Sequence, residues 1–405
     1  MKVHIEIVTG QAMANLLPIL AIQPDVVVLL TSDSMLSKQK ILEDLIKQTP
    51  QLAQCKVQVV PGLPDSGIRK IQNFGLEIRM QLEEQYPAAE FIYDLTGGSK
   101  LMAVALASIF SDQNYSQLYL NTENNLLEYI EPHEKAAEQL NELINAKTYL
   151  AANGATWRHA LSEKDEWQQK VQQRKALTFS FATMLAKHTD DMQNFISQLN
   201  KAASLSTNKT AKLVSPQQQI NFLPKACRVL LKQIVEHELI DWQQDNDTTV
   251  YFKSTDAINY LNGGWLEEYF YLVAQQVSLA DSHCGVKISD TSIKKTDSHN
   301  DLDGLCAYNN RLLLVECKTA KFGLDTQKDN NILYKIDSIA SHIGGQFCTR
   351  LLLSALPVDH VTRNNREVNV SARAKSVEVE ILSGQDVLKL KDHLEYWKTH
   401  GKWQA

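Results

Sequence analysis

Strand-like and helix-like stretches alternate four times over the first 145 residues, and this alternation constrains the fold more than any other feature of the sequence. Runs rich in Val, Ile and Leu lie at residues 3–10, 25–32, 56–62 and 91–95. Amphipathic stretches follow them at residues 12–22, 35–47, 68–85 and 100–111. This order is typical of a parallel sheet covered by helices. We therefore predict a Rossmann-like α/β domain over residues 1–145, closed by a hairpin at residues 117–130.

The remaining residues predict two further segments. Residues 146–255 are rich in Gln, Lys, Asn and Ser and keep helical apolar spacing, which predicts a helical connector. From residue 256 the patterns predict a helix over residues 256–277 at the head of the order α-β-β-β-α-β with additions, and therefore a second α/β domain over residues 256–405. A chain of 405 residues has room for two such domains.

Hydropathy and charge limit the classes of function that this chain can have. No apolar run approaches the roughly 20 residues that cross a bilayer, and the first residues lack the apolar core of a signal peptide, so we expect a cytoplasmic protein without membrane contact. The net charge of −6 is uneven, because residues 1–145 hold 10 Lys and Arg against 18 Asp and Glu. The rest of the chain is therefore close to neutral, and nucleic acid would be attracted by local basic patches and bound metal. The six cysteines form no CxxC pair, which argues against a zinc ribbon.

The segment HNDLDGLCAYNNRLLLVECKT, residues 299–319, predicts a β-hairpin that carries charged side chains. Asn309 and Asn310 suit a two-residue turn, because Asn tolerates positive φ angles. If Tyr308 faces Arg311, Asp303 lies opposite Glu316, and Asp301 lies opposite Lys318. Side chains alternate between faces along a strand, so these four charged groups are expected on one face.

Two facing carboxylates destabilise a hairpin unless a cation compensates them. A divalent metal between Asp303 and Glu316 would do so, and such a metal is what a phosphodiester nuclease uses to polarise phosphate and activate water. Lys318 would add a positive charge on the same face. The alternative is a solvated strand end in which Lys318 pairs with Asp301 on the surface.

The stretch NGGWLEEYFY precedes this hairpin and predicts the start of a helix. Its apolar stripe leaves Glu267 and Glu268 on its two flanks, so periodicity does not choose between them as the residue that faces the hairpin.

In the first domain, FIYDLTGGSKLMAVALASIF predicts a buried strand, a tight turn and a helix. Two glycines allow a ligand to approach the backbone closely, and Thr96 or Ser99 can cap a helix whose free amides attract phosphate. The alternative is a tight connection without a ligand. The sequence contains no GxxxxGK[ST] and no GxGxxG, so it supports neither ATP hydrolysis nor NAD binding.

The motifs NDLD and ECK resemble the PD-(D/E)xK nuclease superfamily, whose fold is that of restriction endonucleases. The resemblance implies metal ligation by Asp303, Glu316 and the main-chain carbonyl of Cys317, and a catalytic role for Lys318. The motif GGWLEE resembles the Gly-x-Trp-Leu-Glu of similar nucleases and implies that Glu267 joins the metal site. The proline that often precedes the first Asp is absent here, which leaves the role of Asp301 open.

The phrase DLTGGSK after the fourth strand resembles the CARF domain of CRISPR-associated effectors. This resemblance implies a site for cyclic oligoadenylate, with contacts from the loops after strands one, two and four. The implied residues are Thr9, Gly10, Gln11, Thr31, Ser32, Thr96, Gly97, Gly98, Ser99 and Lys100.

The two motifs in one chain resemble the CRISPR ancillary nuclease family, which implies a homodimer that uses Mn²⁺ or Mg²⁺. We therefore expect an endonuclease of type III CRISPR antiviral defence, activated by cyclic oligoadenylate and acting on single-stranded DNA, plasmid DNA or RNA. Cyclic tetra-adenylate is the activator that we favour over hexa-adenylate. Two rivals stay open: a catalytically silent sensor of the same ligand, and a repair or restriction-type nuclease with no such control. Whether the first domain also degrades its activator is open as well.

Overall fold

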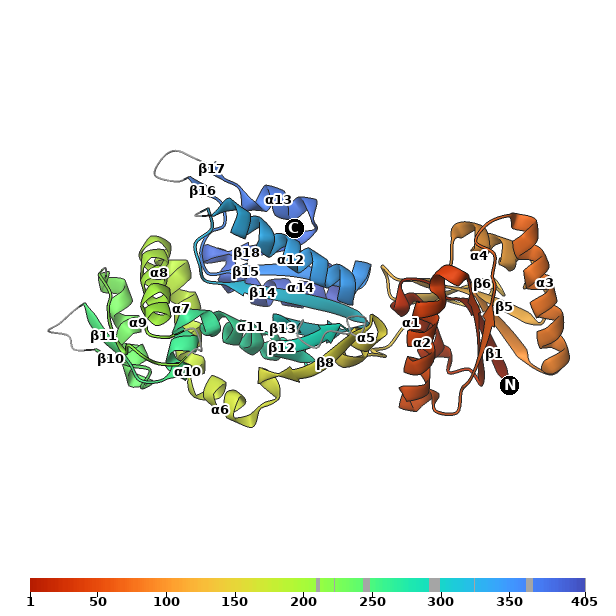
Figure 1. Cartoon of the computed structure of the whole chain (residues 1–405), viewed down its shortest axis with the longest axis horizontal. Coiled ribbons are helices and arrows are strands. Elements are labelled where there is room, and N and C mark those ends of the chain that lie inside the picture. Colours follow the sequence, from red (N-terminus) through yellow and green to blue (C-terminus); the bar gives the residue numbers. More distant parts are fainter. Residues whose placement is uncertain are drawn as a thin grey trace. The chain divides into compact units, whose positions relative to one another are not determined.

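The computed structural model describes residues 1–208, 212–221, 223–242, 248–290, 299–323, 325–361 and 367–404. The chain divides into two compact units. Unit 1 holds Met1–Thr156 with the short segments Tyr308–Asn310 and Ile343–Phe347, and unit 2 holds the rest. Figure 1 draws the whole chain in the colours of its sequence. No helix within the described ranges is both long and apolar enough to cross a membrane.

Unit 1 is built on a seven-stranded sheet in the order β3-β2-β1-β4-β5-β6-β7. The strands are β1 Lys2–Ile7, β2 Val26–Thr31, β3 Lys56–Pro61, β4 Glu90–Asp94, β5 Tyr115–Asn121, β6 Leu126–Glu131 and β7 Glu138–Gln139. The first five are parallel, and β6 and β7 are antiparallel additions. The predicted Rossmann-like domain with a closing hairpin is confirmed.

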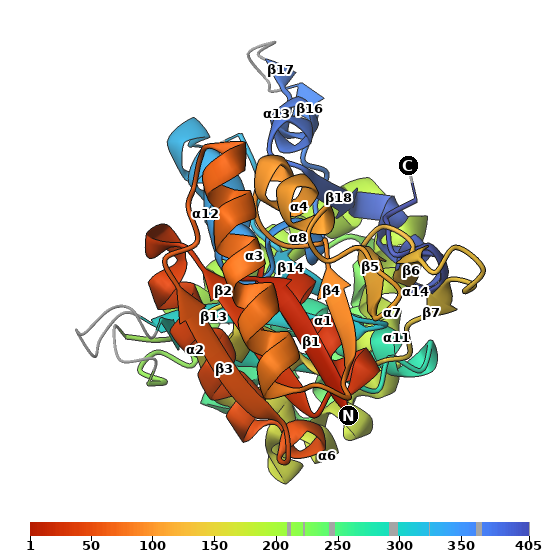
Figure 2. The same cartoon turned by 90° about the vertical axis from the view of Figure 1, so that its right-hand side faces the viewer.

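Helices cover both faces of this sheet. They are α1 Ala12–Ile22, α2 Leu36–Gln48, α3 Ile68–Gln85, α4 Lys100–Ala107 and α5 Ala146–Ala152. Val3, Ile5 and Ile7 of β1 point into a core shared with α3 and α4, which lie together on one side of the sheet while α1 and α2 lie on the other (Figure 2). Because side chains alternate along a strand, His4 and Glu6 point to the side of α1.

The strand order places a topological switch between β1 and β4. Successive connections leave β1 toward β2 and leave β4 toward β5, so the loops after these two neighbouring strands diverge. In open α/β sheets, ligands bind in the crevice at such a point, beyond the carboxyl ends of the strands.

Unit 2 contains a six-stranded sheet in the order β18-β15-β14-β13-β12-β8. The strands are β8 Ala155–Ala160, β12 Ser282–Asp290, β13 His299–Tyr308, β14 Arg311–Lys318, β15 Cys348–Ser354 and β18 Val379–Ser383. β12 and β13 are antiparallel, whereas β14, β15 and β18 are parallel. Strand β8 comes from the segment predicted as a connector, so the sheet is wider than the sequence suggested. The predicted second α/β domain is confirmed.

The predicted helix over residues 256–277 is divided. It consists of α10 Thr255–Asn259, a short π-helical turn Tyr260–Gly264 and α11 Trp265–Gln276. Gly263 has a φ of 128°, and a Cβ there would lie 3.0 Å from Thr319 Oγ1. A glycine is therefore required for both the turn and the close approach of Thr319. The remaining helices of the C-terminal part are α12 Thr326–Ile343, α13 Val370–Ser376 and α14 Leu390–His400.

Most of the predicted connector belongs to unit 2. It forms the helices α6 Asp165–Gln173, α7 Lys175–Lys187, α8 Thr189–Leu205 and α9 Lys225–Glu236, and the small strands β9 Gln217–Gln219, β10 Ile240–Trp242 and β11 Thr249–Phe252. Phe181 of α7 stacks on Trp265 of α11 with ring centroids 4.9 Å apart, and both rings are fully buried. These helices therefore share a core with the helix that precedes the sheet.

Candidate functional site

Strands β13 and β14 bring three charged side chains together in unit 2. Lys318 Nζ lies 2.7 Å from Glu316 Oε1 and 3.5 Å from Asp303 Oδ2. The three groups therefore project from the same face of the hairpin. Asp301 is not part of this group, since its carboxylate lies 3.6 Å from Lys287 on the neighbouring strand β12. The surface pair between Lys318 and Asp301, which was the alternative, is absent from these described residues.

The main chain of Cys317 completes the arrangement. Its amide donates a hydrogen bond of 2.8 Å to Asp303 Oδ2, and its carbonyl oxygen accepts one of 3.0 Å from Lys318 Nζ. The first bond fixes the rotamer of Asp303 relative to β14. The second places the Cys317 carbonyl beside the carboxylates, where it can serve as an oxygen ligand.

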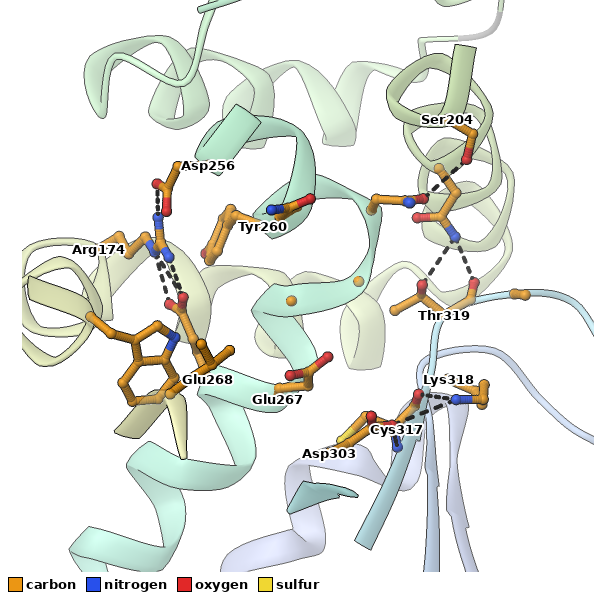
Figure 3. Close-up of a pocket in the computed structure, with 18 of the residues that line it drawn as sticks. Arg174, Ser204, Asp256, Tyr260, Glu267, Glu268, Asp303, Cys317, Lys318 and Thr319 are labelled. Carbon is orange, nitrogen blue, oxygen red and sulfur yellow. Dashed lines mark hydrogen bonds and ion pairs between the residues drawn. The ribbon is translucent and has the colours of Figure 1, made fainter. Parts of the chain in front are cut away.

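The structure distinguishes the two glutamates of α11. Glu267 lines the same cavity as Asp303 and Lys318, and Figure 3 shows its carboxylate on their side of the helix. Glu268 instead accepts hydrogen bonds of 2.9 and 3.0 Å from Arg174 Nε, and Arg174 also bonds to Asp256 at 2.8 Å. The Glu268 carboxylate is therefore already paired with Arg174 in a buried ion pair, and Glu267 is the glutamate that faces the hairpin.

The electrostatics of this cluster favour a cation. Burial, and then the charge of Asp303, raises the pKa of Glu267 to about 8. Burial and the neighbouring Glu316 raise the pKa of Asp303. Burial alone lowers the pKa of Lys318, but Asp303 and Glu316 outweigh it, so that the net pKa is raised and the ammonium stays charged. Burial and mutual repulsion therefore disfavour the charged forms of Glu267 and Asp303, and a bound cation would offset both effects.

The donor set fits a hard divalent metal. Carboxylate oxygens of Glu267, Asp303 and Glu316 and the carbonyl oxygen of Cys317 are the ligands that Mg²⁺ and Mn²⁺ prefer. None of the four donors is a thiolate or an imidazole, so nothing in the set favours a soft metal.

A second lysine contacts this cluster from α12. Lys335 Nζ lies 3.3 Å from both carboxylate oxygens of Glu316. The sequence analysis did not find Lys335, because its helix begins after a loop and a helical lysine carries no signal that distinguishes it from a solvated one. Only the packing of α12 near β14 brings it to Glu316.

The cluster opens into a cavity of about 740 Å³. Part of its wall comes from the segment that was predicted only as a connector, including Trp167, Arg174, Asn200, Lys201 and Ser204. Asn200 Nδ2 donates to the carbonyl oxygen of Thr319 at 3.0 Å and contacts Thr319 Oγ1 at 3.1 Å. Helix α8 is therefore tied to the residue that follows Lys318. No motif marks these residues in the sequence.

In unit 1, the loops after β1 and β4 meet at the switch point. Thr9 N donates to Asn15 Oδ1 at 3.0 Å, and Asn15 Nδ2 donates to Ile7 O at 2.9 Å. A Cβ on Gly97 would overlap the Ile7 carbonyl oxygen and would lie 3.4 Å from Asn15 Nδ2. The loop Thr9–Gln11 and the turn Thr96–Lys100 are therefore neighbours. The close packing of this turn on β1 is one reason why residue 97 is a glycine.

The helix cap after β4 is also defined. Ser99 is the N-cap of α4, accepting a bond of 3.2 Å from Met102 N. Thr96 does not cap the helix, because its hydroxyl accepts a bond of 2.8 Å from Leu120 N. Gly98 has a φ of 77°, which suits glycine, and Lys100 is exposed.

The loop after β2 differs from these two loops. The Thr31 side chain is fully buried and bonds to Leu29 O, and Ser32 is 4% exposed, with its hydroxyl 3.0 Å from that of Ser34. In this unit, then, the Thr31 side chain is not presented at the surface.

Two family models match the chain. Residues 254–401 match the family described as "Card1-like, endonuclease domain", and residues 3–149 match "Card1 CARF domain". Residues 150–253, which include the helices that wall the cavity, lie between the two matches. No curated protein matches the chain.

Three solved structures share the fold. Protein VC1899 from Vibrio cholerae is 18% identical with a TM-score of 0.78, and the match covers 100% of this chain and 99% of that one. Can2 from Sulfobacillus thermosulfidooxidans, in complex with cyclic tetra-adenylate, is 21% identical with a TM-score of 0.75, over 98% of this chain and 97% of that one. A type III CRISPR defence DNA nuclease activated by cyclic oligoadenylate is 14% identical with a TM-score of 0.50, over 87% of this chain and 45% of that one.

Proposed function

The chain is a CRISPR-associated CARF-domain nuclease, with a Card1 CARF domain over residues 3–149 and a Card1-like endonuclease domain over residues 254–401, and on this premise we propose its substrate, metal and activator. It is a metal-dependent endonuclease that cleaves DNA or RNA after cyclic oligoadenylate binds to its CARF domain. Cyclic tetra-adenylate is the proposed activator. The protein acts in type III CRISPR antiviral defence.

One observation carries the nuclease half of the proposal. Glu267, Asp303, Cys317 and Lys318 line one cavity in unit 2, and Lys318 also contacts Glu316 and the Cys317 carbonyl. A catalytically silent sensor would have no need to keep a buried Glu316 and the half-buried Glu267 and Asp303 around a charged lysine, because removing carboxylates from water is costly.

The proposed roles follow from the donor atoms. Glu267, Asp303, Glu316 and the carbonyl of Cys317 would hold Mn²⁺ or Mg²⁺. When bound, such an ion polarises the phosphodiester and lowers the pKa of water. Lys318 stays charged and stabilises negative charge that develops on the phosphate. The Cys317 amide keeps Asp303 in the orientation that the site requires.

The activator half of the proposal rests on unit 1. The loop Thr9–Gln11 and the turn Thr96–Lys100 adjoin at the switch point of the sheet, and Lys100 is exposed in an otherwise acidic domain. Free amides at the start of α4 can bind phosphate. Thr31 and Ser32 remain weaker candidates. Because the activator is a symmetric ring, we propose that two copies of the chain bind it as a homodimer.

Control by the activator requires differential affinity for two states of the protein. The ring must bind more tightly to the conformation in which the nuclease cavity accepts nucleic acid. The likeness to the Can2 structure with cyclic tetra-adenylate and to a DNA nuclease activated by cyclic oligoadenylate supports this kind of control.

The test compares wild type with Lys318→Ala and with the control Lys391→Ala, whose side chain is 53% exposed on α14. Each is incubated with single-stranded DNA, plasmid DNA and RNA in Mn²⁺, with and without cyclic tetra- or hexa-adenylate. We expect cleavage by wild type and Lys391→Ala only with activator, and a loss of roughly 10²- to 10³-fold for Lys318→Ala.

Other outcomes distinguish the rivals. Cleavage without activator favours a repair or restriction-type nuclease, and activator binding without cleavage of any substrate favours a silent sensor. The fate of the activator in the same reactions, followed by chromatography, shows whether the CARF domain degrades it.

A further inference from the structure

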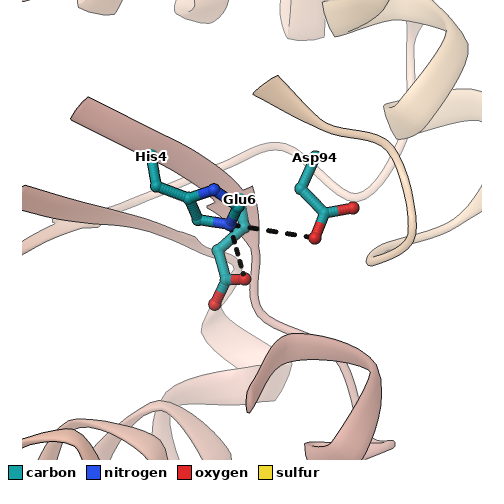
Figure 4. Close-up of side chains that lie close together, drawn as sticks. All are labelled: His4, Glu6 and Asp94. Atoms are coloured by element: carbon teal, nitrogen blue, oxygen red, sulfur yellow. Dashed lines mark hydrogen bonds and ion pairs between the residues drawn. The ribbon is translucent and has the colours of Figure 1, made fainter. Parts of the chain in front are cut away.

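A second group of metal-ligating side chains lies inside the CARF domain, away from the nuclease cluster. His4 and Glu6 come from β1 and Asp94 from β4, where Glu6 and Asp94 are register partners in the parallel pair. Their exposures are 0%, 0% and 1%. Figure 4 shows both carboxylates directed at the same ring nitrogen of His4.

Hydrogen bonds satisfy only part of this cluster, and the one between His4 Nε2 and Glu6 Oε2 is long. His4 Nε2 lies 3.3 Å from Glu6 Oε2 and 3.8 Å from Asp94 Oδ2. A ring nitrogen carries at most one proton, and N–H···O bonds normally measure about 2.7–3.2 Å. In the part of the chain that the structure describes, His4 Nδ1, Glu6 Oε1 and Asp94 Oδ2 have no hydrogen-bond partner.

The charges also lack compensation. Among the described residues, no lysine or arginine forms an ion pair with either buried carboxylate, and His4 is their only ion-pair partner. Burial raises the pKa of Asp94 to about 7 and that of Glu6 well above its ordinary value, and it lowers the pKa of His4. Two carboxylates without a permanent cation must acquire protons or a metal ion, because an isolated buried charge is too costly.

We propose that His4, Glu6 and Asp94 bind a divalent transition-metal ion, Zn²⁺ or Mn²⁺, within the CARF domain. One ligand atom from each residue lies within 4.8 Å of the others. Metal–nitrogen and metal–oxygen bonds of about 2.0–2.2 Å place neighbouring ligand atoms about 3.0–3.5 Å apart, so a slight contraction brings the three donors to this spacing. One imidazole with two carboxylates favours a transition metal over Ca²⁺ or Mg²⁺.

The position of this ion indicates a structural role. Asp94 Oδ1 accepts a bond of 2.7 Å from Thr96 N, and Asn15, whose amide adjoins Glu6, holds Thr9 N at 3.0 Å. The ion would therefore join the carboxyl ends of β1 and β4, where the two loops proposed for activator binding begin. The metal site itself does not depend on the proposed function, but this role in ordering the loops does. Full burial leaves no path by which a substrate could contact the ion.

The first test measures the metal bound at this site in a chain whose nuclease site has lost two of its proposed metal ligands. The full chain carrying Asp303→Asn and Glu316→Gln is loaded with Zn²⁺ or with Mn²⁺, desalted and analysed for metal content. We expect about one ion per chain to remain, because a buried site formed by folding releases its metal slowly. Adding His4→Gln to the double variant should remove that ion, whereas adding His133→Gln, at a side chain 76% exposed, should not.

A second measurement does not use the His4 variant, so the proposal can still be tested if that variant misfolds. The double variant loaded with Co²⁺ should show visible absorption that excess Zn²⁺ removes and Mg²⁺ does not, and a chelator should lower its Tm. The proposal is overturned if the loaded double variant holds no metal and shows no such spectrum, since protons alone then compensate the cluster. It is also overturned if a folded His4→Gln chain retains the ion. Cleavage and activator binding do not enter these readouts, so a failure of the proposed function would leave them unchanged.

Discussion

Lys318 Nζ lies 2.7 Å from Glu316 Oε1, two positions earlier on the same strand, and this contact keeps the lysine charged. Burial alone would lower the pKa of Lys318, but Asp303 and Glu316 raise it above its ordinary value. A lysine in this state is a poor general base. It contributes a fixed positive charge beside the carboxylates.

If Lys318 acts through its charge, Lys318→Arg should retain more cleavage than Lys318→Gln, which keeps a polar side chain without charge. We expect Lys318→Gln to lose roughly 10²- to 10³-fold in rate and Lys318→Arg to lose about tenfold less, since Arg lengthens the side chain but keeps the charge. Single-turnover cleavage at saturating Mn²⁺ measures both. Equal losses would point to a role in proton transfer instead.

Glu267→Gln and Glu268→Gln form a matched pair on adjacent residues of α11. Glu267→Gln should lower cleavage at least about 10- to 100-fold, the loss typical of removing even a residue that only orients a metal ligand. Glu268→Gln should leave cleavage nearly intact at low temperature but cost about 3–5 kcal/mol in the free energy of unfolding, because it leaves Arg174 without its buried partner. Activity and denaturant unfolding of both variants decide the assignment. The opposite pattern would exchange the two roles.

The metal-free chain should lose stability as the pH rises. The pKa of Glu267 is raised from its ordinary 4.5 to about 8, so the folded chain binds more protons than the unfolded chain between these two values. The free energy of unfolding therefore falls as the pH rises from 4.5 to 8. Urea unfolding in a chelator at several pH values, compared with Glu267→Gln, isolates this contribution. A difference between the two proteins that does not change with pH would contradict it.

Gly97 and Gly10 offer a steric comparison within the proposed activator site. A Cβ at Gly97 would overlap the Ile7 carbonyl oxygen, whereas a Cβ at Gly10 would meet no atom within 4 Å. Gly97→Ala should therefore destabilise the CARF domain by about 1–3 kcal/mol and weaken activator binding, while Gly10→Ala should fold normally. Thermal unfolding and calorimetric titration with cyclic tetra-adenylate test this. Normal stability of Gly97→Ala would mean that the turn can shift away from β1.

Lys335 should compete with metal for Glu316. Removing its charge in Lys335→Ala should lower the Mn²⁺ concentration needed for half-maximal cleavage roughly two- to fivefold, since a like charge next to the ion is removed. Lys328→Ala, at a side chain 82% exposed on the same helix, is the control. An unchanged Mn²⁺ requirement would show that Lys335 swings away from Glu316 when metal binds.

Local patterns predicted most of the elements well. Hydrophobic period and turn residues located the strands of the Rossmann-like domain and the hairpin of β13 and β14, because these signals depend on neighbours in the sequence. The prediction of a single helix over residues 256–277 was wrong, since Asn262 and Gly263 leave helical geometry there. Two basic clusters of the sequence, Lys294 with Lys295 and Arg363 with Arg366, Arg373 and Lys375, are further candidates for phosphate contacts. Of these residues only Arg373 and Lys375, on α13, lie within the described residues.

Local sequence patterns were enough to predict the two α/β domains, the alternation that places Asp303, Glu316 and Lys318 on one face, and the glycine-rich turn after β4. In its periodicity the sequence did not decide between Glu267 and Glu268: the resemblance of GGWLEE implied Glu267, and the buried pair of Glu268 with Arg174 leaves Glu267 as the one that faces the hairpin. Nor did it reveal Lys335, the cavity wall formed by α8, or the cluster of His4, Glu6 and Asp94. Each of these depends on contacts between residues far apart in the chain, and the periodicity of a single element carries no information about its distant neighbours.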